Sequence, residues 1–148
     1  MCIPVPQAAF HPSRATARTG IVLIAHAPLA SAFAQVAGHV LDGSAAALAA
    51  LDVRCDCPRE EAASTAETLA ASMGCAELLV LVDIHGGPTP CAVAQRLCES
   101  WGARARLLGG LNVPMLLTAL ECSRLEVGRL AQVAAEAGRR SVVDGLPF

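Results

Sequence analysis

Lysine is absent from this 148-residue sequence, in which all 11 basic residues are arginines. Without lysine the chain can form neither a Schiff base with a carbonyl substrate nor the phosphate contact of a P-loop lysine. Aromatic residues make up only 3% of the chain, the net charge is −2, and no basic cluster occurs. These features argue against a nucleic-acid partner, because such surfaces combine basic patches with stacking groups.

Long apolar runs are also missing. Stretches such as "ELLVLV" are far shorter than the roughly 20 residues that cross a bilayer, so no membrane insertion is expected. The seven cysteines are scattered without a disulfide-scaffold pattern, which is typical of a reducing compartment and predicts a cytoplasmic protein. Residues 1–18 lack the apolar core of a secretory signal. We expect them to be a disordered extension, or a start codon assigned too early, and residues 19–148 to be one domain.

Apolar strand patterns alternate with helical patterns from Thr19 onward. Strands are expected in "GIVLIAH", near Ala49 to Val53, in "ELLVLVDI" and in "ARLLGG". Helices are expected in "LASAFAQVAGHVLD", "EEAASTAETLAASMG", "CAVAQRLCESWG", "PMLLTALEC" and "LEVGRLAQVAAEAG". The alternation predicts an α/β domain with an open, doubly wound, mostly parallel sheet and helices on both faces. We expect the strand order 2-1-3-4, and "RRSVVDG" can form a terminal strand.

Two polar residues, His26 and Asp83, stand at the ends of the first and third predicted strands. With the order 2-1-3-4 these strands are neighbours, and the ligand-binding switch point lies between them. A carboxylate that accepts from one ring nitrogen fixes the tautomer and leaves the other nitrogen as a nucleophile. The following loop, with Gly86, Gly87 and Thr89, opens a helix whose N–H groups can cradle an anion. Together these features predict a phosphohistidine site.

Each feature also has a structural interpretation: a core histidine, a capping carboxylate, or an ordinary turn. Only their coincidence at one sheet edge favours the functional interpretation. His85 is a candidate second imidazole beside Asp83. A different class of function is a thiol or metal-binding module built from Cys55, Cys57, His85 and Cys91, although the C-x-C spacing is a weak metal signal. The main hypothesis requires no metal and no cofactor.

Three segments, "GIVLIAHAPLASAF", "LLVLVDIHGGPTPCAVAQRL" and "LLGGLNVPMLLTAL", carry a resemblance to a known family. In order and spacing they resemble the IIA component (EIIA) of mannose-type phosphotransferase systems (PTS), the mannose, fructose and sorbose group that uses phosphoenolpyruvate. The similarity runs from about Gly20 to Val143. It agrees with the phosphohistidine site inferred from the residues.

This resemblance implies a phosphocarrier, and hence a phosphotransferase. His26 would accept phosphate from the histidine-phosphorylated carrier protein HPr, with Asp83 beside it, and would pass it to a IIB component during sugar transport. The resemblance also implies a homodimer in which a C-terminal strand, here "RRSVVDG", crosses to the partner. An alternative is a regulatory member whose phosphorylated state controls another protein. No IIB or IIC sequence is fused here, so the sequence leaves both possibilities open.

The loop after Asp83 departs from the family pattern. The usual loop reads D-L-F-G-A-T-P-S-N or D-L-F-G-G-S-P-F-N, whereas "DIHGGPTPCA" reads as one residue longer and lacks the asparagine. His85 replaces an aromatic or apolar residue, and Pro88 cannot donate an N–H. We therefore expect an altered anion cradle.

Overall fold

The computed structural model describes residues 18–41 and 48–145. Within them lie β1 (Thr19–His26), α1 (Leu29–Val40), β2 (Leu48–Val53), α2 (Arg59–Ser72), β3 (Glu77–Val82), α3 (Thr89–Trp101), the 3-10 helix η1 (Gly102–Arg104), β4 (Ala105–Leu108), α4 (Val113–Glu121) and α5 (Val127–Arg140). The predicted N-terminal extension, apart from Arg18, lies outside the described residues.

The four strands form one parallel sheet with the order β2-β1-β3-β4. This confirms the predicted α/β class and strand order. The central strand β1 pairs with β2 on one side, where His26 lies opposite Val53. On the other side it pairs with β3, where Ile24 lies opposite Val82. Since parallel strands end at the same edge, the residues that follow β1 and β3 are neighbours.

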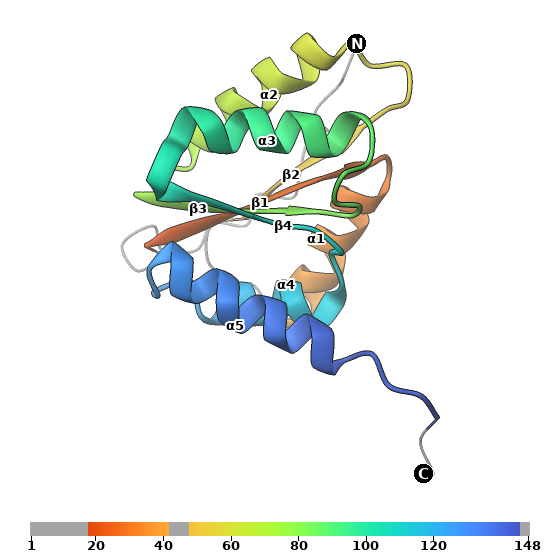
Figure 1. The fold of residues 1–148 in the computed structure, drawn as a ribbon, viewed down its shortest axis with the longest axis vertical. Helices are drawn as coiled ribbons and strands as arrows, with labels where there is room; N and C mark the ends of the chain where they lie inside the picture. Colours follow the sequence, from red (N-terminus) through yellow and green to blue (C-terminus); the bar gives the residue numbers. More distant parts are fainter. Residues whose placement is uncertain (1–17, 42–47, 146–148) are drawn as a thin grey trace.

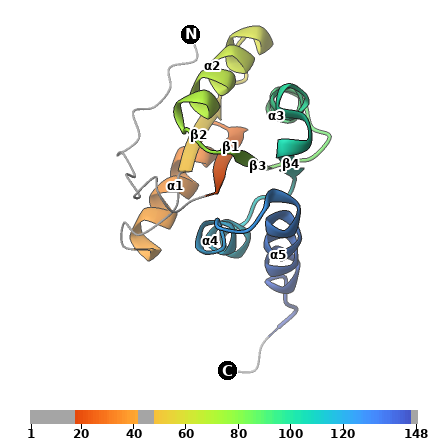
Figure 2. The ribbon, with the colours of Figure 1, turned by 90° about the vertical axis from the view of Figure 1, so that its left-hand side faces the viewer.

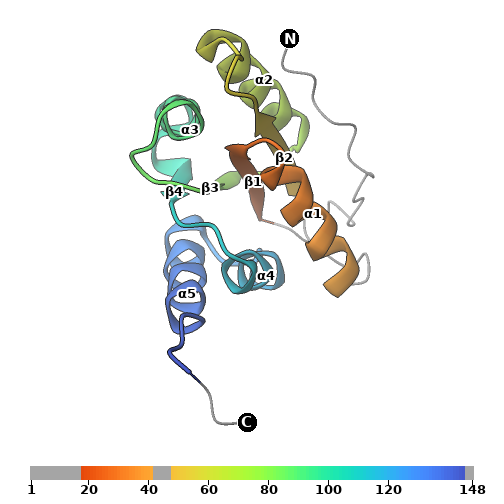
Figure 3. The same cartoon turned by 90° about the vertical axis from the view of Figure 1, so that its right-hand side faces the viewer.

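Helices cover both faces of the sheet. Figure 1 shows α2 and α3 above the sheet and α4 and α5 below it. The perpendicular views in Figures 2 and 3 show that α1 lies on the same side as α4 and α5. The helices that follow β1 and β3 therefore cover opposite faces, which is the doubly wound arrangement expected for an open parallel sheet.

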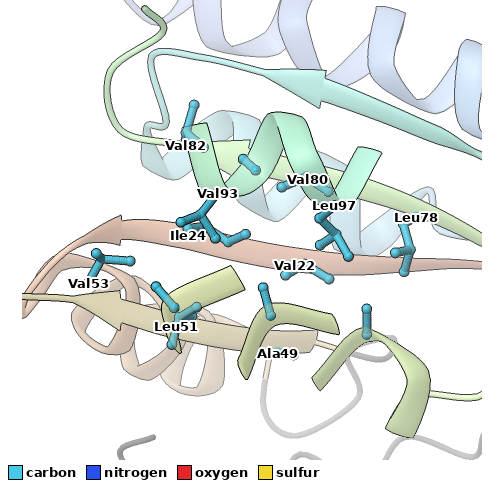
Figure 4. Close-up of a cluster of buried hydrophobic side chains, with 14 of the residues drawn as sticks. Val22, Ile24, Ala49, Leu51, Val53, Leu78, Val80, Val82, Val93 and Leu97 are labelled. Carbon is cyan, nitrogen blue, oxygen red and sulfur yellow. The ribbon is translucent and has the colours of Figure 1, made fainter. Parts of the chain in front are cut away.

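The core has one apolar cluster on each face. Alternate residues of β1, such as Val22 and Ile24, meet α2 and α3 in the cluster drawn in Figure 4. The residues between them, such as Ile21 and Leu23, face α1, α4 and α5. Between their polar ends, the central strands are consequently apolar on both faces, as strands buried on both faces must be.

The C-terminal strand prediction is wrong at its start, because Arg139 and Arg140 form the last turn of α5. The sequence places the helix end at Gly138, but this glycine lies inside the helix. A Cβ there would come within 2.8 Å of the Asn112 Nδ2, so glycine permits close packing rather than ending the helix. Residues 141–145 of this single chain contain no strand.

At the opposite end of the sheet from His26, the Glu77 carboxylate connects three segments. It accepts hydrogen bonds from the Arg18 Nε (3.0 Å), the Thr19 hydroxyl (3.4 Å) and the Val127 N–H at the start of α5 (3.0 Å). Burial raises the pKa of the Glu77 carboxyl, but the hydrogen bonds from Arg18 and Val127 outweigh burial and hold this pKa below its usual value. The ionised form therefore stabilises the fold.

Glu77→Gln should destabilise the protein more at pH 7 than at pH 3.5. The Glu77 contribution is complete above its ordinary pKa of 4.5 and is lost as the pH falls through the lower folded-state pKa. We expect a loss of about 1–2 kcal/mol of unfolding free energy at pH 7. Urea unfolding at both pH values measures it, with exposed Glu121→Gln as the control. An equal loss at both pH values would contradict the assignment.

Candidate functional site

His26 is the last residue of a strand that is otherwise buried. Its side chain is 31% exposed, so the imidazole lies at the boundary between the core and solvent. The chain stays attached to the sheet just beyond it, because the Ala27 N–H donates to the Val53 carbonyl of β2 at 3.0 Å. A histidine at this strand end is thus held by regular backbone geometry while one side of its ring faces outward.

Asp83 directly follows β3 and contacts His26, as the sequence predicts for neighbouring strand ends. The Asp83 Oδ2 lies 2.7 Å from the His26 Nδ1 and also accepts the His26 backbone N–H at 3.1 Å. The other oxygen, Oδ1, accepts the Ile84 N–H at 2.9 Å. The Asp83 side chain is only 11% exposed. Three hydrogen bonds therefore hold a nearly buried carboxylate in one orientation.

The charge state of Asp83 sets the tautomer of His26. Burial raises the pKa of the Asp83 carboxyl, but hydrogen bonds from the His26 ring, the His26 N–H and the Ile84 N–H outweigh burial and hold this pKa below its usual range. An ionised carboxylate can only accept, so the hydrogen of the close contact belongs to Nδ1. In the neutral ring the Nε2 then carries the free lone pair and can act as a nucleophile.

Asp52, at the end of β2, is a further carboxylate at this sheet edge that the sequence analysis did not single out. Its Oδ1 accepts the Ser31 N–H at 3.0 Å, and the Ser31 hydroxyl donates to the Pro28 carbonyl at 3.0 Å. Pro28 directly precedes α1. Asp52 therefore fixes the start of the helix that follows His26. The sequence pattern that could have identified Asp52 is an acidic residue near the end of an apolar strand, the same pattern that identified Asp83.

The loop after Asp83 connects β3 to α3. Gly86 has a φ of +75°, a conformation that side-chain-bearing residues rarely adopt. Its N–H donates to the Cys91 Sγ in the first turn of α3, at 3.2 Å. Gly86 thus contributes a backbone turn, and its N–H is directed to a thiol instead of to a ligand.

Only part of the predicted anion cradle can donate hydrogen bonds. Pro88 and Pro90 have no N–H, and the N–H of Gly86 is engaged. The N–H groups of Gly87 and Thr89 and the Thr89 hydroxyl remain at the amino end of α3, whose first turn holds no acidic residue. The positive end of a helix and these few donors favour an anion.

A second loop, between β4 and α4, supports the first. The Leu111 N–H donates to the Val82 carbonyl at 3.0 Å. A Cβ on Gly109 would lie 2.3 Å from the His85 Cβ, so only glycine allows the two loops to approach this closely. The Asn112 side chain caps α4. Asn112 and Pro114 are ordinary helix-start residues, whereas Gly109 is explained only by its contact with the other loop.

The described residues give no support to a metal site at the cysteines of the alternative interpretation. Among residues 18–41 and 48–145, no three His, Cys, Asp or Glu side chains are placed to hold one metal ion. Cys55, Cys57, His85 and Cys91 therefore do not form such a group. Asp83 is hydrogen-bonded to His26 and Ile84 and not to His85, so the suggested second imidazole does not pair with this carboxylate.

Comparison with protein-family models assigns the chain to a family. Residues 20–135 match the EIIA-man family model, described as the PTS system fructose IIA component. The chain belongs to this family of IIA components. Among curated proteins, none matches the sequence significantly. No helix of the IIA chain, within the part that the structure describes, is long and apolar enough to cross a membrane.

Solved structures share the fold of this IIA chain. The mannose/sorbose-specific IIA subunit from Enterococcus faecalis is 24% identical, with a TM-score of 0.77 over 88% of this chain and 98% of that one. The EIIA component from Streptococcus agalactiae is 20% identical, with a TM-score of 0.75 over 85% and 96%. A IIA protein associated with the fucose utilization operon of Streptococcus pneumoniae is 17% identical, with a TM-score of 0.71 over 87% and 94%. Identities this low show the fold alone.

Asp83→Asn should reverse the tautomer of His26. The asparagine NH2 group can donate to Nδ1, which would move the ring hydrogen to Nε2. Ring-nitrogen chemical shifts of labelled protein report the tautomer directly. Asp52→Asn is the matched control, because Asp52 is bonded to Ser31 and not to the ring. Unchanged His26 ring shifts in Asp83→Asn would show that this hydrogen bond does not set the tautomer.

Proposed function

We propose that the chain is a phosphocarrier of the phosphoenolpyruvate-dependent sugar phosphotransferase system and that the His26 Nε2 carries the phosphoryl group. The donor is the histidine-phosphorylated carrier protein HPr, and the acceptor is a IIB component. The observation that carries this proposal is the 2.7 Å contact between the His26 Nδ1 and the Asp83 Oδ2. It leaves Nε2 as the nucleophilic atom of a partly exposed ring. The family match supports the wider assignment to a PTS component.

The transfer step uses groups that the chain already holds. The lone pair of Nε2 attacks phosphorus, a P–N bond to Nε2 forms, and the P–N bond to the donor histidine breaks. The hydrogen on Nδ1 stays in place, so the His26 ring gains positive charge during the attack. In this proposal the ionised Asp83 stabilises this charge, and Gly87 and Thr89 at the amino end of α3 supply hydrogen bonds to the phosphoryl oxygens. Transfer to IIB is the reverse step with a new acceptor.

We expect the wild-type protein to be labelled from phosphoenolpyruvate only when enzyme I and HPr are both present. His26→Ala should abolish this labelling. The label should be acid-labile and base-stable, as a phosphoramidate is. His85→Ala is the matched control, and its labelling rate should stay within about threefold of wild type, because His85 makes no hydrogen bond to Asp83. If His26→Ala were fully labelled and His85→Ala were not, the His85 imidazole would be the phosphate acceptor.

We also propose a homodimer formed through β4 and the C-terminal segment. β4 is an edge strand, and exposed edges are prone to pairing with other chains. A groove of about 1080 Å³ runs along it beside α5, with Arg106 and Leu108 among its lining residues. Beyond α5 the chain leaves the body of the molecule (Figure 1), with Val142 83% exposed. An edge and an exposed apolar segment can cover each other between two copies.

Ending the chain at Ser141 should convert the dimer into monomers or aggregates. This truncation removes Val142 and Val143, the exposed apolar residues proposed to pair with the edge of the partner's sheet. Light scattering at micromolar concentration measures the mass. A chain ending at Gly145 retains both valines and is the matched control. A monomeric wild-type protein would contradict the proposal, as would a dimer that survives the truncation.

A further inference from the structure

A buried thiol lies against the loop that follows Asp83. Cys91 is 1% exposed, and its Sγ accepts the Gly86 N–H at 3.2 Å. Cys91 belongs to α3, whose inner side chains Val93 and Leu97 are buried in the core. Sulfur is a weak acceptor. This bond nevertheless joins an exposed stretch of loop to a helix that packing holds in place.

The same loop orients the Asp83 carboxylate. The Ile84 N–H donates to the Asp83 Oδ1, while Oδ2 accepts from the ring and the backbone of His26. Ile84 lies two residues before Gly86. A rotation of the backbone at Gly86 would therefore also move the Ile84 N–H, which donates to the Asp83 Oδ1. Rotation of the carboxylate would then carry Oδ2 away from the imidazole. A continuous path thus connects the thiol to the ring.

We propose that Cys91 is a positioning residue for phosphoryl transfer at His26, an inference that rests on the proposed function. Its role is that of a hydrogen-bond acceptor, and its volume is secondary. The thiol holds Gly86 in its positive-φ turn. This turn keeps Asp83 aligned with His26 and leaves the other loop donors facing the anion.

The loop has a second support, which limits the expected effect. His85 packs against Gly109 so closely that a Cβ on the glycine would meet the His85 Cβ at 2.3 Å. Loss of the thiol bond should therefore loosen the loop without releasing it completely. We expect slower transfer instead of no transfer.

Two substitutions separate the acceptor from the volume. Cys91→Ser keeps an acceptor at this position, whereas Cys91→Val fills the site and has none. Cys98 provides the matched control, since it is a partly buried thiol of the same helix that packs against the same core cluster away from the loop. Cys98→Ser and Cys98→Val should both behave as wild type at the site.

Three measurements follow the path from thiol to ring. Hydrogen exchange of the Gly86 amide should be about tenfold faster in Cys91→Val and within about twofold of wild type in Cys91→Ser. The His26 ring-nitrogen shifts should show a mixture of tautomers in the valine variant alone. The rate of transfer from phosphorylated HPr should fall about fivefold in Cys91→Val and less than about twofold in Cys91→Ser.

Equal behaviour of Cys91→Ser and Cys91→Val would overturn the proposal, because it would show that only packing matters. Wild-type exchange of Gly86 in the valine variant would overturn it as well. If Cys91→Val does not fold by circular dichroism, Cys91→Ala replaces it and should show the same losses. Should the wild-type protein not accept phosphate, the proposed function fails, while Gly86 exchange and the His26 shifts still decide the role of Cys91.

Discussion

The register between β1 and β3 is the constraint on which the candidate site depends. Both strands are apolar on both faces, so they lack the polar alternation that usually fixes register. Polar pairs at their ends supply this information: Thr19 and Glu77 at one end, His26 and Asp83 at the other. A slip would leave partly buried carboxylates without donors, at a cost of about 1–3 kcal/mol for each. The contact that defines the site therefore also helps to select the sheet.

The meeting of His26 with Asp83 could be predicted because it follows from regular geometry. Helix and strand periodicities give an alternating α/β chain, and parallel strands place their carboxyl ends together. The end of α5 was less predictable, since a glycine is the usual signal for a helix end. Gly138 serves another purpose, which is the close approach of α5 to Asn112. Local patterns cannot distinguish these two uses of glycine.

The supporting contacts of the site could not be predicted, because they join irregular segments far apart in the sequence. Asp52 caps a helix from the neighbouring strand, and Gly109 lets one loop pack on another. Cys91 shows the same difficulty at short range. A cysteine in a helical, apolar pattern predicts a core residue, and Cys91 is one. Its sulfur also accepts the N–H of Gly86, and this contact depends on the positive φ of Gly86. A glycine in the sequence permits a positive φ but does not require it.

The sparse anion cradle proposed at the start of α3 would suit a phosphocarrier better than a tight binding site would. Pro88 and Pro90 remove two N–H donors from the start of α3, and a thiol takes a third. Each further donor to the phosphoryl oxygens would stabilise the phosphorylated ground state as well as the transition state, and uniform binding of this kind does not accelerate transfer. In the proposed transfer Asp83 acts differently, because it would stabilise the charge that the ring gains during attack. In the proposed relay, the chain therefore places its strongest interaction on the nucleophile and keeps its hold on the phosphoryl group weak.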